Sequence, residues 1–383
     1  MSLTGRATFF TALALVLASI VLVSLLWNRV PRRGWLRWPL RVSMVVLCQL
    51  TACSLAAIAL NDTDRFYNSW SELVGGHQDA VSTAHAQRRP SFTAELDRQL
   101  TLHHHHGGSA VVSMPVTEAG LARTDNALVY LPAAYFDAKY ASRQFPVIEL
   151  LDGFPGSPQT WVGPLHLQHV ADTEIAAGRA LPFVAVMPVQ NFLPGGRDGE
   201  CLDVPSGPKV ESTLVTAVRA AVVADLRVSS DRRAWAVMGY STGGYCALKI
   251  ALRFPDLFAS AVSILGNTSP YADGNVSGWF ASHPGLRDQN DPMWLITHRP
   301  QPDLAVLLTG SSGDRPTQRA AVAFASLAHA PLRVQLNMSA RGGHNFHTFG
   351  LFELVGFDWL SGQLRPSLVP GARVTKPAPR HTR

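Results

Sequence analysis

The pentapeptide Gly239-Tyr240-Ser241-Thr242-Gly243 constrains the fold of this chain more than any other feature of its sequence. It directly follows an apolar, strand-like run at 234–238, and Gly244 then opens a stretch with helical periodicity. A serine between a strand and a helix occupies a strained turn, so the residues two before and two after it must be small. Such a turn lifts the hydroxyl above the end of a sheet, beside a helix N-terminus that favours developing negative charge. The pattern predicts that Ser241 is a nucleophile.

Short apolar runs rich in β-forming residues alternate with helix-like stretches over much of the remaining chain. The strand-like runs are 110–116, 127–131, 146–151, 183–188, 234–238, 259–265, 303–309 and 332–338, and the helical stretches are 209–223, 244–253, 318–328 and 351–360. Alternation of this kind builds a mostly parallel sheet with helices on both faces, here opened by antiparallel strands. We therefore predict an α/β-hydrolase fold over residues 109–365. Residues 366–383, rich in Pro and Arg, are predicted to form a flexible tail.

A serine hydroxyl becomes a good nucleophile when a histidine takes its proton and a carboxylate orients that histidine. In this fold the order along the chain is serine, acid, histidine. Asp314 and His344 each follow a strand-like run after Ser241, so both are predicted at the carboxyl edge of the sheet. Asp303 precedes its strand and belongs to the opposite edge, and His347 is expected to line the site or face solvent. The predicted catalytic residues are Ser241, Asp314 and His344.

The tetrahedral intermediate of acyl transfer needs two backbone N–H donors. One donor is normally the residue after the nucleophile, here Thr242. The other is expected in the loop Asp152-Gly153-Phe154-Pro155-Gly156, which follows a central strand, and Phe154 is its predicted donor. His106-Gly107-Gly108 is similar to a lipase oxyanion loop but precedes the first strand of the domain, so it is not assigned this role.

The first sixty residues contain two uncharged apolar runs, 7–27 and 42–60, each long enough to cross a bilayer. Arginines without any acidic residue separate them, and tryptophans flank the connection: Arg29, Arg32, Arg33, Arg37 and Arg41 with Trp27, Trp35 and Trp38. The positive-inside tendency makes this connection cytoplasmic. We therefore predict a two-pass transmembrane hairpin over residues 1–60 in the cell membrane, with the lipid bilayer as partner and the catalytic domain on the extracytoplasmic side.

Three alternatives for this segment stay open. A signal peptide would be cleaved, yet no small-x-small cleavage site closes the first run before the arginines. Leu50-Thr51-Ala52-Cys53 is similar to a bacterial lipobox, which would make Cys53 a lipid anchor, although an apolar stretch rather than a polar tether follows it. A buried helix pair in a soluble protein would be joined by an unusually basic connection.

Residues 61–108 are interpreted as a linker because Gly and Pro punctuate a polar stretch without periodicity. Its run His103–His106 could bind a metal, but no cysteine or carboxylate pattern accompanies it, so neither a metal nor another cofactor is predicted. The net charge of +6 could indicate a nucleic-acid partner. Only four of the 33 basic residues are lysines, and an excess of arginine fits a GC-rich coding bias equally well, so no nucleic-acid partner is predicted.

Four motifs together resemble those of the esterase D superfamily, in particular its branch of secreted mycobacterial mycolyltransferases. They are Leu150-Leu151-Asp152-Gly153, the elbow at 239–244, Asn290-Asp291-Pro292 and Gly342-Gly343-His344-Asn345-Phe346. The resemblance spans residues 112–360. It implies an α/β-hydrolase with Ser241 as nucleophile and His344 as base. The acid, a glutamate in mycolyltransferases and an aspartate in many esterases, falls on Asp314.

The chain departs from the mycolyltransferase pattern at two places. Pro155 stands where those enzymes have an arginine that helps to hold trehalose, so trehalose is not implied as the acceptor. Phe346 replaces a tryptophan near the base and keeps an aromatic side chain there. The counterpart of Asp152 touches sugar in that branch, so Asp152 either contacts substrate or braces its loop.

The segment 267–300 is longer than a simple connection and is rich in aromatic residues, among them Tyr271 and Trp279. It is either an acyl-binding wall, to which Trp279 would contribute, or a surface excursion with its own small core. Cys201 and Cys246 could form a disulfide in an oxidising compartment, but their spacing does not decide the pairing. Cys48 lies with Cys53 in the second apolar run.

These features predict a membrane-anchored serine esterase that acts through an acyl-Ser241 intermediate on an ester of the cell envelope or an extracellular ester. One alternative is an acyltransferase similar to mycolyltransferases, with a sugar or envelope hydroxyl as acceptor. Another is a non-catalytic module that binds cell wall, against which the intact serine, acid and histidine order argues. The acyl chain and the acceptor cannot be read from the sequence.

Overall fold

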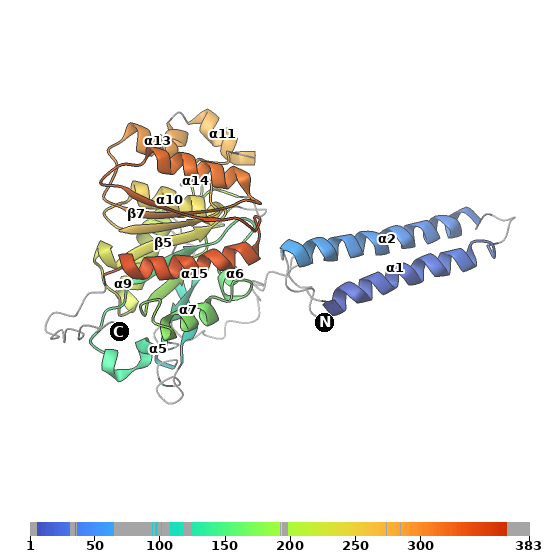
Figure 1. The fold of residues 1–383 in the computed structure, drawn as a ribbon, viewed down its shortest axis with the longest axis horizontal. Coiled ribbons are helices and arrows are strands. Elements are labelled where there is room, and N and C mark those ends of the chain that lie inside the picture. Colours follow the sequence, from blue (N-terminus) through green and yellow to red (C-terminus); the bar gives the residue numbers. More distant parts are fainter. Residues whose placement is uncertain are drawn as a thin grey trace. The chain divides into compact units, whose positions relative to one another are not determined.

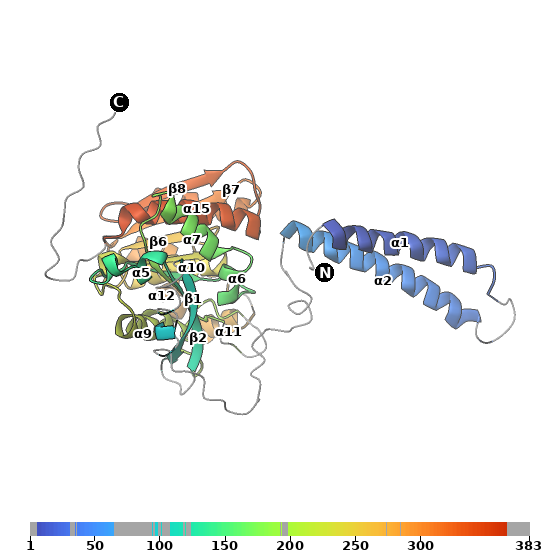
Figure 2. The ribbon, with the colours of Figure 1, turned by 90° about the horizontal axis from the view of Figure 1, so that it is seen from below.

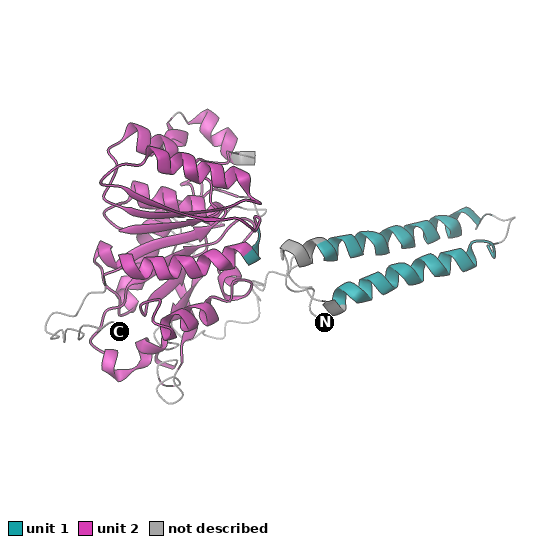
Figure 3. Ribbon diagram, viewed as in Figure 1, with its two compact units in different colours: residues 1–88, 345–347 teal, residues 89–344, 348–383 magenta. Residues whose placement is uncertain are grey.

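The computed structural model describes residues 6–30, 35, 37–64, 94, 96–98, 101, 108–117, 119, 124–191, 193, 198–272, 274–283 and 285–365. The run His103–His106, the predicted tail and most of the predicted linker lie outside these residues. Residue contacts divide the chain into two units, one of residues 1–88 with 345–347 and one of residues 89–344 with 348–383 (Figure 3).

The first unit is a pair of helices, α1 (Arg6–Leu26) and α2 (Arg37–Asp64). Thr8, Ala12 and Ser19 form the buried stripe of α1, and Ser19 Oγ lies 3.0 Å from Thr51 Oγ1 of α2. Most of the other apolar side chains are open, as Leu50 shows with 62% exposure. By length and composition both helices are able to cross a membrane. Of the two candidate spans, 11% of one and none of the other is buried.

Helix α2 is longer than its apolar run, because it begins inside the predicted basic connection. Pro39 falls in its first turn, where a missing N–H interrupts no intrahelical hydrogen bond. The Arg37 guanidinium lies over the Trp38 ring at 5.8 Å, and that of Arg41 lies over the Trp27 ring at 4.8 Å. These basic side chains therefore lie in or pack against the part of the helix that precedes the apolar run.

The second unit contains one eight-stranded sheet in the order β1-β2-β4-β3-β5-β6-β7-β8 (Figures 1 and 2). Its strands are β1 (Ala110–Thr117), β2 (Thr124–Leu131), β3 (Val147–Leu151), β4 (Val184–Met187), β5 (Trp235–Tyr240), β6 (Ser260–Ile264), β7 (Ala305–Ser311) and β8 (Arg333–Ser339). β2 pairs antiparallel with β1 and β4, and all other pairs are parallel. Every residue of β3 to β7 is buried, as in parallel sheets covered on both faces. The predicted mostly parallel sheet with antiparallel opening strands is confirmed.

Helices cover both faces of this sheet (Figure 1). One face carries a continuous helical run made of α8 (Val210–Ser212), η2 (Thr213–Val218) and α9 (Arg219–Asp225), and its middle part, η2, is π-helical. The same face carries α10 (Thr242–Arg253), α13 (Pro292–His298) and α14 (Arg315–Leu327). The other carries α6 (Pro158–Val162), α7 (Leu167–Ala176) and α15 (Phe346–Gln363). A Cβ on Gly356 of α15 would come within 2.6 Å of Met238 Sδ in β5, which shows how closely this helix packs.

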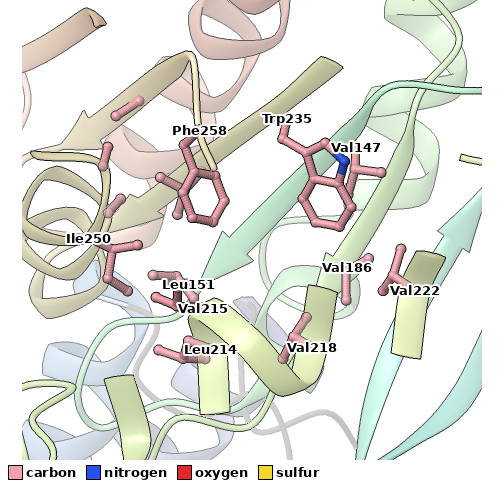
Figure 4. Close-up of a cluster of buried hydrophobic side chains, with 14 of the residues drawn as sticks. Val147, Leu151, Val186, Leu214, Val215, Val218, Val222, Trp235, Ile250 and Phe258 are labelled. Atoms are coloured by element: carbon pink, nitrogen blue, oxygen red, sulfur yellow. The ribbon is translucent and has the colours of Figure 1, made fainter. Parts of the chain in front are cut away.

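The core between the sheet and the first group of helices is continuous. Figure 4 shows Trp235 of β5 beside Val147 of the adjacent strand β3, with Val186 of β4 and Val222 of α9 in the same cluster. The Trp235 ring is fully buried and lies edge-on to Phe258 at 6.5 Å. The remaining short elements lie in the connections: α5 (Ala133–Phe136), η1 (Ala138–Tyr140), η3 (Arg232–Ala234), α11 (Gly274–Ser282) and α12 (Leu286–Gln289).

Cys201 and Cys246 form a disulfide with their Cα atoms 6.1 Å apart, which resolves the pairing that the sequence left open. Cys246 belongs to α10, so the bridge joins this helix to the loop that precedes α8. Cys48 and Cys53 are free thiols in α2.

Candidate active site

Ser241 occupies a strained turn between β5 and α10, with φ at 54° and ψ at −124°. Its amide donates to the Ile264 carbonyl at 2.9 Å, and its carbonyl accepts from the Tyr245 amide at 3.1 Å. A Cβ on Gly239 would come within 2.2 Å of the Gly243 carbonyl oxygen, and one on Gly243 within 2.2 Å of the Leu151 oxygen. The small residues on both sides of the serine are therefore a steric requirement of this turn.

Three side chains from separate strand ends form one chain of hydrogen bonds in the second unit. His344 Nε2 lies 2.8 Å from Ser241 Oγ, and His344 Nδ1 lies 2.6 Å from Asp314 Oδ2. The neutral tautomer with its proton on Nδ1 donates to the carboxylate and leaves Nε2 to accept from the hydroxyl. The carboxyl ends of parallel strands share one edge of a sheet, which brings β5, β7 and β8 to this point. The structure thus brings together all three residues that the sequence analysis singled out.

Asp314 is held rigidly. It is 7% exposed and caps the N-terminus of α14, where its carboxylate accepts from the Thr317 amide at 3.5 Å. The neighbouring Gly313 amide donates to the Gly342 carbonyl at 3.0 Å, and a Cβ on Gly313 would come within 2.1 Å of that oxygen. The loops of the acid and the base therefore pack directly against each other.

The imidazole of His344 rests on an aromatic side chain that the sequence analysis did not identify. The Phe349 ring of α15 meets it edge-on, with centroids 5.1 Å apart and an interplanar angle of 89°. Phe349 in turn packs on Tyr240 at 4.9 Å, and Tyr240 on Trp161 at 5.3 Å. No local motif signals this stack, because its members come from distant parts of the chain.

The two predicted backbone donors lie on either side of the nucleophile. Thr242 is the first residue of α10, and the first amides of a helix have no partner within it. A Cβ on Gly153 would come within 3.1 Å of Ser241 Cβ, so the loop that contains Phe154 lies against the serine. The use of the Thr242 and Phe154 amides as an oxyanion hole stays a prediction.

Asp152, for which substrate contact and bracing of its loop were both predicted, is fully buried. Asp152 Oδ2 accepts from Asn191 Nδ2 at 3.0 Å, and the Asp152 carbonyl accepts from Gln190 Nε2. Asn191 also donates to the Gly156 carbonyl at 2.9 Å. Burial raises the pKa of the Asp152 carboxyl well above its ordinary value. These hydrogen bonds favour bracing of the loop 152–156, the second of the two predicted roles, and a substrate contact of Asp152 stays a prediction.

The remaining site candidates lie where their segments were expected. Trp279 is half-buried in α11, and Phe346 opens α15; their contact with a substrate stays a prediction. Asp303 precedes β7 and pairs at 2.7 Å with Arg333, at the edge opposite to Asp314. Within the described residues, no cluster of three or more His, Cys, Asp or Glu side chains is arranged to hold a metal ion.

The chain is similar to known esterases over most of the second unit. The family model described as "Putative esterase" matches residues 119–351. An uncharacterised protein of Corynebacterium glutamicum is 30% identical over 199 residues, which cover 50% of this chain and 44% of that relative. The chain therefore spans less than half the length of this relative.

Solved structures show the same fold. A ferulic acid esterase superposes with a TM-score of 0.58 at 19% identity, covering 67% of this chain and 98% of that one. An S-formylglutathione hydrolase of Agrobacterium tumefaciens gives a TM-score of 0.57 at 18% identity, covering 68% and 96%. With the matched family model, these findings confirm the predicted superfamily. The chain belongs to the Putative esterase family and has the α/β-hydrolase fold.

Proposed function

We propose that this chain is a membrane-anchored serine esterase that cleaves an ester of the cell envelope, or an extracellular ester, through an acyl-Ser241 intermediate. The observation that carries the proposal is the hydrogen-bonded series from Ser241 Oγ through His344 to Asp314, at 2.8 and 2.6 Å. A serine in an elbow, a base within reach and an acid behind the base are the parts that nucleophilic catalysis requires.

In the first half-reaction His344 Nε2 takes the proton of Ser241 as Oγ bonds to the ester carbonyl carbon. The carbonyl oxygen becomes an oxyanion, and the amides of Thr242 and Phe154 donate to it. His344 then gives its proton to the leaving alcohol oxygen as the carbon–oxygen bond breaks. Asp314 keeps its hydrogen bond to Nδ1 and stabilises the imidazolium that forms.

In the second half-reaction water attacks the acyl carbon and loses a proton to His344, which returns it to Ser241 Oγ as the acid leaves. A sugar or envelope hydroxyl in place of water would make the chain an acyltransferase. The motif resemblance to mycolyltransferases favours this second candidate, whereas Pro155 in the oxyanion loop argues against trehalose as its acceptor. Partitioning of a preformed acyl-enzyme between water and added sugars or alcohols distinguishes the two. Acyl products that increase with acceptor concentration favour transfer, and free acid alone favours hydrolysis.

Membrane attachment is part of the proposal. The apolar side chains of α1 and α2 are open, and the predicted basic connection between the helices favours a cytoplasmic location for it. The second unit would then lie outside the cytoplasm, in a compartment where the Cys201–Cys246 disulfide is stable. The full chain should stay with membranes in alkaline carbonate, and a variant that lacks residues 1–60 should not. Recovery of the full chain in the soluble fraction would overturn the anchoring.

Turnover of p-nitrophenyl acetate by Ser241→Ala tests the catalytic proposal. We expect activity to fall to the background level, because removal of the nucleophile from such a triad costs about 10⁶-fold in kcat. Ser326→Ala is the matched control, since Ser326 is exposed on α14 and bonds only locally, to the Ala323 carbonyl. Substantial turnover by Ser241→Ala would contradict the proposal.

A further inference from the structure

Helix α10 is buried from Thr242 to Leu252, and one of its faces carries four side chains at helical spacing. Thr242, Tyr245, Cys246 and Lys249 lie at positions i, i+3, i+4 and i+7 of the helix that starts beside the nucleophile. None of the four is more than 6% exposed. Polar and charged residues buried on one helix face need partners, and here most of the partners come from a single short turn.

The turn at residues 198–201 is joined to this helix face at three points. Thr242 Oγ1 donates to Asp198 Oδ2 at 3.1 Å. Cys246 is bridged to Cys201, and Lys249 Nζ donates to the Cys201 carbonyl at 2.8 Å. A polar contact, a covalent bond and a charged donor thus fix the turn to the nucleophile helix.

Glu200 is the residue that this arrangement holds in place. Its φ is 48°, in the left-handed region, and Cys201 after it also has a φ of 48°. Non-glycine residues keep such strained conformations only where the surroundings determine them. The Glu200 amide donates to Asp198 Oδ1 at 2.8 Å, and the Glu200 carbonyl accepts from Lys249 Nζ at 3.4 Å. The backbone is therefore held so that the side chain points in one direction.

The Glu200 carboxylate is completely buried and accepts two successive backbone amides from the segment 267–300. Oε2 accepts from Tyr271 N at 3.0 Å, and Oε1 accepts from Ala272 N at 2.8 Å. Ala272 has a φ of 56°, so both ends of this contact are conformationally strained. A buried carboxylate that uses both oxygens on neighbouring amides fixes the position of that backbone closely.

Tyr271 lies against the nucleophile helix. Its ring meets Tyr245 of α10 edge-on at 6.4 Å, yet the residue is 41% exposed. Burial of its hydroxyl, and then the nearby negative charges of Asp314 and Glu200, raise the pKa of Tyr271 above its ordinary value. An aromatic side chain that lies against the nucleophile helix and is partly exposed is able to contact an apolar part of a substrate.

We propose that Tyr271 determines specificity for the acyl chain of the ester and that Glu200 is the positioning residue that holds Tyr271 at the site. This inference rests on the proposed esterase function, since it assigns the acyl-binding wall of the same site. Glu200 acts through the backbone of Tyr271 and does not touch substrate. The apolar face of an acyl chain of six or more carbons would pack on the open side of the ring, and an acetyl group would not reach it.

The test measures kcat and KM of the full chain in detergent for p-nitrophenyl esters from acetate to octanoate. Tyr271→Ala and Glu200→Ala should each raise KM for octanoate about tenfold relative to acetate, with the change in KM rather than kcat. Tyr271→Phe should recover most of the preference lost in Tyr271→Ala. Glu200→Gln keeps one acceptor oxygen and should show a smaller change than Glu200→Ala.

Glu174→Gln is the matched control, because Glu174 is another buried carboxylate but pairs with Arg179 at 2.6 Å on α7. It should leave the octanoate-to-acetate ratio unchanged. If Glu200→Ala does not fold, as judged by its thermal transition, Glu200→Gln and Tyr271→Ala still test the roles of Glu200 and Tyr271. An unchanged octanoate-to-acetate ratio in both of these variants overturns the inference.

Labelling of Ser241 with a fluorophosphonate separates this inference from the proposed function. Wild-type chain that does not label contradicts the esterase itself. Variants that label at the wild-type rate but keep the wild-type chain-length ratio contradict only the roles of Glu200 and Tyr271.

Discussion

The buried ionisable groups around α10 differ from those elsewhere in the same domain. Lys249 is fully buried and lies 3.1 Å from Glu211 Oε2, while Glu211 Oε1 also accepts from Arg253 at 3.0 Å. Glu149 in the middle of β3 and Glu353 in α15 are just as deeply buried, yet neither carboxylate has a hydrogen-bond partner among the described residues. Lys249, Glu211 and Arg253 therefore form a paired set, and Glu149 and Glu353 form an unpaired set.

The difference shows what each set contributes. Paired buried charges add little net stability, but they favour one arrangement of the loops that they join, because a separated partner would remain buried and uncompensated. Unpaired carboxyls avoid this cost by holding a proton. Burial raises the pKa of Glu149 to about 8, against the smaller opposing effect of Arg219, and burial raises the pKa of Glu353 well above its ordinary value. The paired set around α10 therefore orders the site, whereas the unpaired set makes stability fall as pH rises.

The largest effect is expected at the paired acid of the active site. Asp314→Asn should lower kcat about 10⁴-fold, because an amide cannot hold the productive tautomer of His344. Steady-state turnover of p-nitrophenyl acetate measures this. Asp291→Asn is the matched control, since Asp291 also caps a helix with its carboxylate, at α13. An Asp314→Asn variant with kcat within tenfold of wild type would contradict the assignment of Asp314.

Removal of the buried cation should have the next largest effect. Lys249→Met leaves Glu211 without one of its two cations and should lower the free energy of unfolding by about 3–5 kcal/mol in urea titrations. Lys139→Met is the control, because Lys139 pairs with Asp137 on the surface, with its side chain 67% exposed, and solvent-screened pairs of this kind contribute little to stability. Equal losses in the two variants would remove the distinction between buried and surface pairs.

Substitution of an unpaired buried carboxyl should raise the stability of the folded chain, whereas substitution of Lys249 should lower it. Glu149 has a pKa of 4.5 in the unfolded chain and about 8 in the folded one, so the folded chain binds more protons between these values and its stability falls as pH rises through them. Glu149→Gln should remove this loss and stabilise the chain by about 2–3 kcal/mol at pH 7, with little change at pH 4. Thermal unfolding of both proteins at the two pH values tests it.

Glu174→Gln provides a second comparison between paired and unpaired buried carboxyls. Its hydrogen bond to Arg179 lowers the pKa of Glu174, so this carboxylate stabilises the folded chain above its unfolded pKa and stops doing so as pH falls. The substitution should therefore lower the melting temperature at pH 7, whereas Glu149→Gln should raise it. Shifts in the same direction would show that pairing does not control these carboxyls.

Much of the site follows from local sequence. The glycines around Ser241 are required by contacts within the turn itself, and Asp314 and His344 each follow a strand whose alternation with helices fixes its direction. The surroundings of Asp152 and Phe349 could not be predicted in this way. The burial of Asp152 and the contact of Phe349 with His344 depend on residues that are distant in the sequence.

The conformation of the turn at 198–201 also could not be predicted from local sequence. Its left-handed residues are Glu200 and Cys201, types that a sequence pattern does not associate with positive φ. Their conformation depends on α10 and on Tyr271, which lie far along the chain, so neither the disulfide nor the Glu200 contact could be derived from spacing. The early start of α2 at Arg37 was missed for a related reason, since hydrophobicity alone marked its bounds.

The most direct test of the account is mass spectrometry of the folded full chain after reaction with a fluorophosphonate. The account predicts one adduct per chain, on the tryptic peptide that contains Ser241, with labelling lost in Ser241→Ala and slowed strongly in His344→Ala. Folded wild-type protein without an adduct on Ser241, or with labelling equally fast in His344→Ala, would contradict it.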